Sequence, residues 1–468
     1  MNKLLYKQEP SFIRLGVQSE RKINIFSGEY MNFISCAKTE RLSVDCIAEE
    51  LKKAGYPELE LYNKTVKNIP QKFFVKFFDK NIAAVNLSGK KISEGVNFIL
   101  SHIDSPRIDL KQNPLIEMSE MAMLKTHYYG GIKKYQWLNT PLALYGVVFT
   151  GTGKKVKIAI GDNEKDPVFI IPDIAPHLSH KIQDGKVIKD AVTGEMLNAL
   201  AGTTYNRGNL KEKDKLKICV LDALNKKYHI REEDLLTAEL QLVPAIKPRF
   251  SGFDESLIAG YGHDDRACSF ASLKAILDSD SEKITRPAIC IFYDKEEIGS
   301  EGATGAKSKF IEDILFFIME YSGVSFQSYH LRKVFLKSNA VSADVNTVIN
   351  PNFPEPYEKQ NCSRLGYGVV LTKFTGSGGK YSANDANSEY VSKISAAFNK
   401  KRIPWQIGEL GKVDEGGGGT IAKYIAEYGC NIVDLGVGVM SMHSPFEIVS
   451  KYDLYSTYLA YKSFLAMR

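Results

Sequence analysis

Residues 288–297 read AICIFYDKEE, a run of six apolar or aromatic residues followed directly by four charged ones. A strand that is apolar along its whole length is buried on both faces, as in the centre of an α/β sheet. Residues 288–293 are therefore predicted to form a central strand. Glu296 and Glu297 come just after it, at the carboxyl end of the strand, where open α/β sheets bind their ligands. This stretch thus predicts the fold class and one edge of a functional site.

Four further segments carry metal-type ligands in similar surroundings, and their residues are His102 with Asp104, Asp264, Asp344 and His443. His102 and Asp104 follow the apolar run VNFIL at 96–100, and His443 follows the run IVDLGVGV at 432–439. Two imidazoles and several carboxylates gathered at the carboxyl ends of central strands predict a hydrolytic metal site.

The composition is that of an ordinary globular protein with two domains. The chain has 468 residues, of which 44% are hydrophobic and 25% charged. A net charge of +6 is weak for this length and does not indicate nucleic-acid binding. No apolar stretch is long enough to span a membrane, and no secretory leader is recognised. The seven cysteines form no C-x-x-C pair, and their odd number favours a reducing compartment, so a cytoplasmic location is expected.

Strand and helix patterns alternate in the first and last parts of the chain. This alternation predicts a mixed, mainly parallel sheet with helices on both faces. Helices are expected at 39–55, 265–277, 310–321, 387–398, 420–428 and 453–466. Between these parts, short strands at 142–149, 155–160 and 168–171 are separated by glycine turns and predict an antiparallel β-rich insert. The expected organisation is a catalytic domain in two parts, 1–111 and 249–468, interrupted by an inserted β-rich domain at 112–248.

His102 and Asp104 are two residues apart, so in an extended segment their side chains point the same way. Asp104 could then bond one ring nitrogen of His102 while the other nitrogen binds a metal. A surface turn made by the same residues is an equally good interpretation of this pair alone. Asp264 precedes a helix and could simply cap it, which is the favoured interpretation when it is taken alone.

Glu296 and Glu297 are the stronger signal. Adjacent carboxylates at the end of a buried strand are costly unless a cation is present, and one can bind metal while its neighbour activates water. The alternative is a solvated loop after the strand. A lone histidine such as His443 is usually a core residue, although Gly436 and Gly438 before it allow close backbone approach to a helix or ligand.

Six stretches match a known family in the family's order: SHIDSPRIDLK at 101–111, GHDDR at 262–266, DKEEIGSEGATGAKS at 294–308, SADVNTVINPN at 342–352, GGKYSAN at 378–384 and GVGVMSMHSPFE at 436–447. Through them the chain resembles the aspartyl aminopeptidases, dinuclear metallo-exopeptidases with a phosphorylase/hydrolase-like α/β sheet that form tetrahedral dodecamers. Each stretch alone is weak evidence for the family. The six stretches in this order cover almost the whole chain and are together specific for it.

The resemblance implies ligands for two divalent ions, with His102 and Asp344 on one ion, Glu297 and His443 on the other, and Asp264 bridging both. It makes Glu296 the general base and Asp104 the residue that orients His102. Zinc suits this mixture of imidazoles and carboxylates, and manganese or cobalt could occupy the same site.

The resemblance also implies a histidine that acts in a neighbouring subunit. The segment 171–178, IPDIAPHL, resembles the family segment that carries this residue, here His177. By itself His177 would be interpreted as a surface histidine. The loop at 132–141, IKKYQWLNTP, departs from the family pattern, which affects the expected subunit contacts and substrate choice.

Substrate contacts are expected from two further segments. Lys380, followed by Tyr381, is the expected partner of a substrate carboxylate. Gly417 and Gly418 lie in a run of four glycines whose backbone amides could approach a peptide, although such a run could also be a flexible loop.

The predicted function is removal of N-terminal residues, acidic ones by the resemblance, from short peptides by a homo-oligomer, a dodecamer built from dimers. One alternative is a metallocarboxypeptidase or deacylase on a related sheet, which would need an arginine clamp for the substrate carboxylate. Arg107 and Arg266 lie near the ligand segments, but neither has a clear reason to face the pocket. A second alternative is an inactive scaffold, which the complete set of costly ligands argues against.

Overall fold

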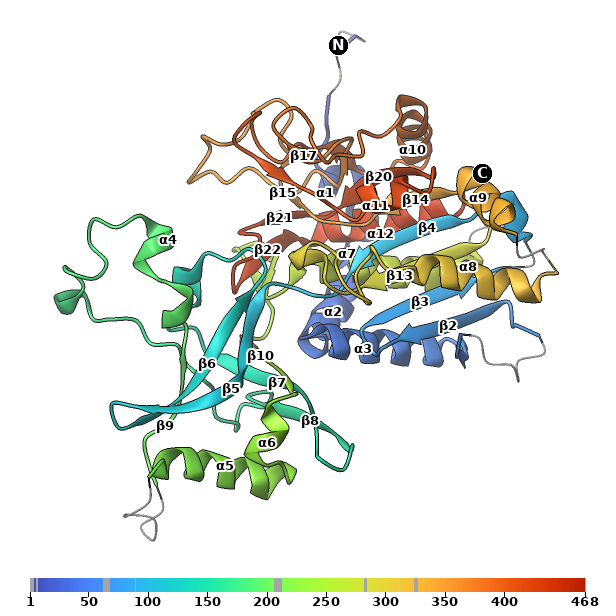
Figure 1. The fold of residues 1–468 in the computed structure, drawn as a ribbon. Coiled ribbons are helices and arrows are strands. Elements are labelled where there is room, and N and C mark those ends of the chain that lie inside the picture. The colour runs from blue at the N-terminus through green and yellow to red at the C-terminus, as the bar shows by residue number, and fades with distance from the viewer. Residues whose placement is uncertain are drawn as a thin grey trace. The chain divides into compact units, whose positions relative to one another are not determined.

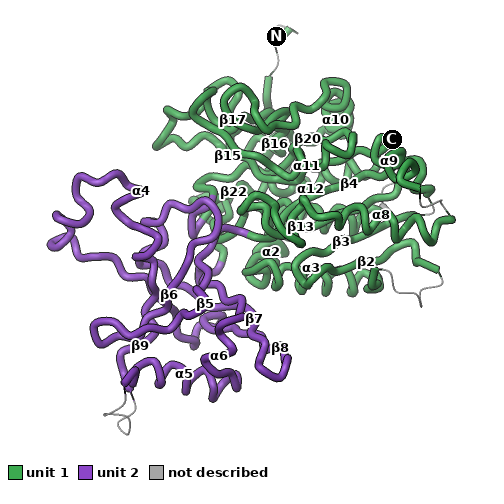
Figure 2. Tube along the Cα trace, viewed as in Figure 1, with its two compact units in different colours: residues 1–104, 248–442, 447–468 green, residues 105–247, 443–446 purple. Residues whose placement is uncertain are grey.

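The computed structural model describes residues 4–5, 7–61, 68–88, 90–205, 213–281, 284–323 and 327–467. The chain forms two compact units (Figure 2). Unit 1 contains residues 1–104, 248–442 and 447–468, and unit 2 contains residues 105–247 and 443–446. Unit 2 begins earlier than the predicted insert at 112–248 because strand β5 (Arg107–Met118) pairs along its length within the sheet of unit 2.

Within the described residues, a nine-stranded sheet forms the centre of unit 1 (Figure 1). Its strands follow the order β1 (Glu58–Leu59), β2 (Lys72–Phe77), β3 (Asn81–Asn86), β13 (Ala288–Tyr293), β4 (Asn97–His102), β14 (Asn339–Ser342), β20 (Asn431–Gly436), β16 (Val369–Thr372) and β18 (Trp405–Ile407). The central strands β13, β4, β14 and β20 are parallel, while β3 and β16 pair antiparallel to them. The predicted fold class, a mixed and mainly parallel sheet, is confirmed.

Helices cover both faces of this sheet because its central strands are apolar on both sides. Along β13, Ile289 and Ile291 belong to one buried cluster, whereas Cys290 and Phe292 belong to the other. The cluster of Cys290 contains residues of α2 (Glu20–Cys36), α3 (Glu40–Lys53), α7 (His263–Leu277), α10 (Ser388–Lys400) and α12 (Lys451–Leu465). The cluster of Ile289 contains residues of α8 (Phe310–Tyr321), α9 (Ser328–Lys337) and α11 (Ala422–Ala426).

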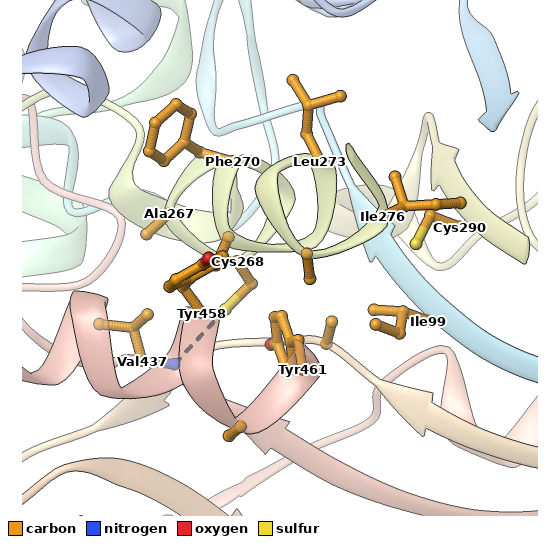
Figure 3. Packing of buried hydrophobic residues seen from close by; sticks show 14 of the residues in the cluster. Ile99, Ala267, Cys268, Phe270, Leu273, Ile276, Cys290, Val437, Tyr458 and Tyr461 are labelled. Atoms are coloured by element: carbon orange, nitrogen blue, oxygen red, sulfur yellow. Dashed lines mark hydrogen bonds between the residues drawn. The ribbon is translucent and has the colours of Figure 1, made fainter. Parts of the chain in front are cut away.

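Helix α7 packs against α12 in the core of unit 1 (Figure 3). Cys268 of α7 accepts a hydrogen bond from the backbone N–H of Val437 over 3.4 Å, and the Tyr461 hydroxyl of α12 donates to the carbonyl of Leu435 over 2.6 Å. These contacts hold the end of β20 against α12 and against α7, the helix whose first residues include Asp264.

The apolar run at 432–439, predicted as one strand, is divided between two sheets. Its first part lies in β20, and its last part lies in β21 (Gly438–Met440) of a separate five-stranded sheet. In the described chain that sheet has the order β11 (Arg249–Ser251), β12 (Leu257–Gly260), β22 (Glu447–Ser450), β21 and β15 (Asn346–Thr347). The division follows from partners far away in the chain, since β21 pairs with β15 and β22.

Unit 2 contains a sheet that is antiparallel throughout, with six strands in its described part. Their order is β8 (Lys155–Ile160), β7 (Leu142–Phe149), β10 (Glu239–Pro244), β5, β6 (Met121–Tyr129) and β9 (Ala199–Gly202). The strand expected at 168–171 is reduced to a single bridge between Phe169 and Leu142. The unit also contains α4 (Ile188–Ala191), α5 (Lys215–Tyr228) and α6 (Glu232–Leu235).

The expected helices lie close to their predicted positions, apart from the segment 420–428, which contains only the short helix α11. Helix α3 begins after Thr39, whose hydroxyl accepts the backbone N–H of Leu42 over 3.3 Å. Cys36 and Cys46 form a disulfide between α2 and α3 that the cysteine spacing did not predict. None of the helices in the described part of the chain combines the length and apolar character needed to cross a bilayer.

Candidate metal centre

His102 is the last residue of β4, and its two ring nitrogens face different carboxylates. Nδ1 lies 3.3 Å from Oδ1 of Asp104 and 3.1 Å from the Asp104 carbonyl oxygen. Nε2 lies 3.2 Å from Oδ1 of Asp264, 3.8 Å from Oδ1 of Asp344 and 4.0 Å from Oε2 of Glu296. The His102 side chain is 1% exposed, so the surface-turn interpretation does not hold. One nitrogen is oriented by Asp104, and the other points into a group of carboxylates.

Asp104 also supports the loop that carries the glutamate pair. Glu296 and Glu297 lie in a single 3-10 turn, η8 (Glu296–Ile298), directly after β13. The two oxygens of Asp104 accept the backbone N–H groups of Glu296 and Glu297 over 3.1 and 3.2 Å. A single buried carboxylate therefore contacts the imidazole, as the sequence predicted, and also the backbone of the two glutamates, which the sequence did not predict.

Asp264 does not cap the helix that it begins. The N-cap of α7 is Gly262, with no side-chain capping bond, and Asp264 has non-helical dihedral angles (φ −81°, ψ 109°). The backbone N–H of Asp264 donates to Oε2 of Glu447 over 3.2 Å, while its carboxylate faces His102. The capping interpretation is therefore wrong, and Asp264 belongs to the candidate site.

Two groups of side chains in the described chain have ligand atoms close enough to share a metal ion. One contains His102, Asp264 and Glu297, and the other contains His102, Asp265 and Asp344, with all ligand atoms of a group within 4.8 Å of one another. Asp265 was not among the predicted ligands. It also accepts the backbone N–H of His102 at Oδ2 over 3.3 Å, so it fixes the end of β4. A second acidic residue beside Asp264 was the only sequence signal for it.

The electrostatics of the site agree with a bound cation. Burial raises the pKa of Glu296 to about 8, with the charges of Asp344 and Asp104 adding to the effect and His102 opposing it. Burial likewise raises the pKa of Asp265. Burial alone would lower the pKa of His102, but hydrogen bonds to the surrounding carboxylates raise it overall. Crowded buried carboxylates of this kind become favourable when a divalent cation compensates their charge, and one imidazole with carboxylates is a donor set that fits zinc.

Asp344 follows β14, and its backbone lies so close to the neighbouring strand β20 that only a glycine fits at position 436. A Cβ on Gly436 would lie 1.9 Å from the carbonyl oxygen of Asp344, and one on Gly438 would lie 2.6 Å from Cγ1 of Val348. The predicted close backbone approach is present at Gly436, whereas the close neighbour of Gly438 is a side chain. At Gly436 the approach allows β20 to lie directly against the backbone of a candidate ligand.

Two predicted residues lie in unit 2 and outside both groups. His443 has Nδ1 2.8 Å from the carbonyl oxygen of Gly131, and its backbone is left-handed (φ 66°). His177 lies in an exposed 3-10 turn, η4 (Pro176–Leu178). The ligand role of His443 and the role of His177 in a neighbouring subunit stay predictions.

The predicted substrate residues are in unit 1. Lys380 Nζ lies 3.2 Å from Oδ2 of Asp385 and 4.0 Å from the centroid of the Phe374 ring, while Tyr381 is exposed. Gly417 and Gly418 form β19 (Gly417–Gly418), which pairs antiparallel with β17 (Gly376–Ser377), so this part of the glycine run is a short ribbon. The substrate contacts of these residues stay predictions.

Glu447 is a site residue that the sequence analysis missed. It is 1% exposed, begins β22, and holds the backbone of Asp264 from a position 183 residues away in the chain. Glu447 is the last residue of the stretch GVGVMSMHSPFE, but nothing in that stretch predicts its contact with Asp264. Only its pairing in the fold reveals its contact with the site.

Comparisons with known proteins show which family the chain belongs to. The family model of the aminopeptidase I zinc metalloproteases (M18) matches residues 33–465. A probable M18 family aminopeptidase 1 from Borrelia garinii is 46% identical over 462 residues, covering 98% of this chain and 99% of the relative. The crystal structure of an M18 aminopeptidase from Thermotoga maritima has a TM-score of 0.93 and 42% identity, covering 98% of this chain and 99% of that one.

A more distant structure shares the fold. The mApe1 dodecamer of S. cerevesiae has a TM-score of 0.76 and 22% identity, covering 95% of this chain and 97% of that one. The family model spans nearly the whole chain, and the relatives from Borrelia garinii and Thermotoga maritima are 46% and 44% identical to it. The chain therefore belongs to the M18 peptidase family and is an aminopeptidase of the zinc metalloprotease class.

Proposed function

We propose that this aminopeptidase uses two divalent ions, zinc in the first instance, to remove acidic N-terminal residues from short peptides. The observation that carries the proposal is the position of His102 Nε2, which lies within 3.8 Å of carboxylate oxygens of Asp264 and Asp344. Glu297 belongs to the same candidate metal group as His102 and Asp264. When bound, two divalent cations would polarise the scissile carbonyl and lower the pKa of the attacking water.

The residues of the chain have distinct roles in this proposal. The ligands are His102 and Asp344 for one ion and Glu297 and His443 for the other, with Asp264 between them and Asp265 supporting the first group. Glu296 accepts the proton of the attacking water and later delivers it to the leaving amine. Asp104 keeps His102 and the glutamate turn in place through the contacts at Nδ1 and at the two backbone N–H groups. Lys380 binds the carboxylate of the first residue when the substrate competes with Asp385 for it.

The test combines metal content with turnover. The enzyme is stripped of metal, reloaded with zinc, manganese or cobalt, and assayed with aspartyl-, glutamyl- and leucyl-chromophore substrates. We expect two ions per chain at full activity, no activity without metal, and faster turnover of the acidic substrates. Full activity with one ion per chain would reject the dinuclear site, and equal turnover of the leucyl substrate would reject the acidic preference.

Unit 2 is the proposed assembly domain of a homo-oligomer, with a dodecamer built from dimers as the specific expectation. In support, its described segment from residue 168 to residue 196 exposes several large apolar side chains, namely Val168, Leu178, Ile182, Val187, Ile188 and Met196. Apolar groups exposed together mark surfaces that contact another protein. Light scattering that finds a stable, active monomer of 52.3 kDa would reject this part of the proposal. A cytoplasmic location is proposed as well, and cell fractionation tests it.

A further inference from the structure

A groove with a cavity volume of about 1140 Å³ runs between α8, α9 and α11 in unit 1. None of the candidate metal ligands lines it. Helix residues of α8 and α9 form two of its walls, and the segments 306–309, 382–383 and 423–429 complete it. The volume is in the range of, or slightly above, ordinary ligand pockets, so the groove can hold several residues of a peptide.

Positive charge predominates in the lining. The ionised side chains of the groove are Lys307, Lys309, Arg332 and Lys423, with Glu312 and Glu427 as the carboxylates. Lys309 and Glu312 pair with each other over 2.8 Å and cancel. Lys423 and Arg332 have no carboxylate of a described residue within 4.0 Å, so they remain available to an anion.

Two of the lysines are held on one tyrosine ring. The Nζ atoms of Lys307 and Lys423 lie 5.0 and 4.9 Å from the centroid of the Tyr424 ring, so they are within about 10 Å of each other. Lys307 also pairs with Glu301. Because Glu301 already offsets the charge of Lys307, Lys423 is the lysine at this ring whose charge is available to an anion.

The faces of the two tyrosine rings in the groove are already in contact with other side chains, so they are not available for stacking on a flat ligand. Tyr428 stacks on Phe335 with centroids 4.4 Å apart and an interplanar angle of 15°, and Lys309 lies 5.3 Å from its ring centroid. The Tyr424 ring already carries its two lysines. The groove therefore presents positive charge rather than stacking surfaces, which favours carboxylates over a nucleobase.

One wall of the groove is hydrogen-bonded to the residue that follows the turn η8 (Glu296–Ile298). The Tyr424 hydroxyl donates to the carbonyl oxygen of Gly299 over 3.2 Å. Gly299 is two residues after Glu297, so their Cα atoms are at most about 7.6 Å apart. The wall at 382–383 directly follows Lys380 and Tyr381, the proposed substrate residues. The groove thus begins where the proposed substrate contacts end.

We infer that this groove binds the part of the peptide substrate that follows the cleaved bond, and that it selects peptides with acidic residues there. This inference rests on the proposed aminopeptidase function. An extended peptide advances about 3.3 Å per residue, so residues three to five positions downstream lie roughly 10–17 Å from the cleaved bond. Their carboxylates meet Lys423 and Arg332, the two cations of the lining that are not paired with a carboxylate of a described residue.

Two matched peptides test the inference: Asp-Ala-Ala-Glu-Glu and Asp-Ala-Ala-Gln-Gln. We expect a higher kcat/KM for the first. Each of the variants Lys423→Gln and Arg332→Gln should reduce that preference by about 2- to 5-fold, the range for exposed charge pairs. Raising the ionic strength from about 0.05 M to about 0.5 M should reduce it in the wild type as well. Lys393→Gln, which changes an exposed lysine of α10, is the matched control and should leave the preference unchanged.

Aspartyl-chromophore substrate separates this inference from the proposed function, because it has no downstream residues. The groove variants should turn it over at the wild-type rate. If the wild type does not cleave it, the proposed function fails. If it is cleaved but the wild type has no preference between the peptides, or the variants keep the preference, the groove is not a substrate site. Variants that change the oligomeric mass and slow every substrate equally would make the groove a contact between subunits and overturn the inference.

Discussion

Carboxylates near the two main sheets of this molecule have pKa values that are shifted in opposite directions. At the ends of the central strands of unit 1, Asp104 and Asp264 are buried, and burial together with neighbouring acids raises the pKa of Glu296 to about 8. On the sheet of unit 2, Glu195 is exposed, and hydrogen bonds from Lys111 and then Lys125 lower its pKa to about 2. In unit 2, two lysines offset the charge of Glu195. In unit 1, the carboxylates of the candidate site surround a single imidazole, that of His102. The buried cluster is therefore the part of the molecule that requires an external cation.

The largest effect is expected from substitutions that distinguish the roles of the adjacent residues Glu296 and Glu297. Glu296→Gln should keep its metal and lose at least about 10²-fold in kcat, because it removes the general base. Glu297→Gln should lose metal as well as activity, because it removes a ligand. Metal analysis and steady-state kinetics on both variants check this. Wild-type turnover by Glu296→Gln would show that the roles are assigned wrongly.

The next largest effect is expected from unit 2. His177→Ala should lower kcat by about 10²- to 10³-fold, equivalent to about 3–4 kcal/mol, if His177 stabilises the oxyanion in a neighbouring subunit. The metal content and the oligomeric mass should stay unchanged, since His177 lies outside both candidate metal groups in the described chain.

Mixing two inactive variants sharpens the test of His177. His177→Ala and Glu296→Gln subunits are combined under conditions that allow exchange, so that some interfaces pair an intact His177 with an intact Glu296. Part of the activity should return. If exchange is verified and no activity returns, His177 does not act across an interface, and unit 2 has no catalytic contribution of this kind.

A smaller effect is expected from the contact between β20 and Asp344. Gly436→Ala places a methyl group 1.9 Å from the carbonyl oxygen of Asp344, so the strand or the ligand must move. Overpacking costs about 1–3 kcal/mol, and we expect a lower Tm together with weaker zinc binding. Thermal unfolding with and without zinc measures both. An unchanged Tm and zinc affinity would show that Asp344 is not held through this contact.

The smallest effect comes from the matched substitution Gly28→Ala on α2. A Cβ there meets nothing within 4 Å, and alanine favours a helix interior over glycine by about 0.5–1 kcal/mol. We expect a slight increase in denaturation midpoint and unchanged kcat. A loss of stability would contradict this and show that space at a glycine is a poor guide in this protein.

The patterns that predicted the fold are local. The run AICIFY at 288–293 forms β13, and its alternate residues enter the two buried clusters on opposite faces of the sheet. Five of the six expected helices lie within a few residues of their predicted positions, because their apolar stripes and end signals lie within the helices themselves. The helices α2, α5 and α9 were not predicted. The run at 432–439 shows the limit of this reasoning. Its apolar residues are continuous, but its partners divide it between two sheets.

The sequence by itself determined which residue types stand at the ends of the central strands, and from them the class of chemistry. His102, Asp264, Asp344 and Glu297 could be named because each lies in a short motif after or beside an apolar run. Only the tertiary structure showed that Asp104 holds both glutamate N–H groups, that Asp265 lies in one of the two candidate metal groups, and that Glu447 supports Asp264. The physical reason is that these contacts join segments from different strands and helices, and their distances are set by strand pairing and helix packing rather than by spacing along the chain.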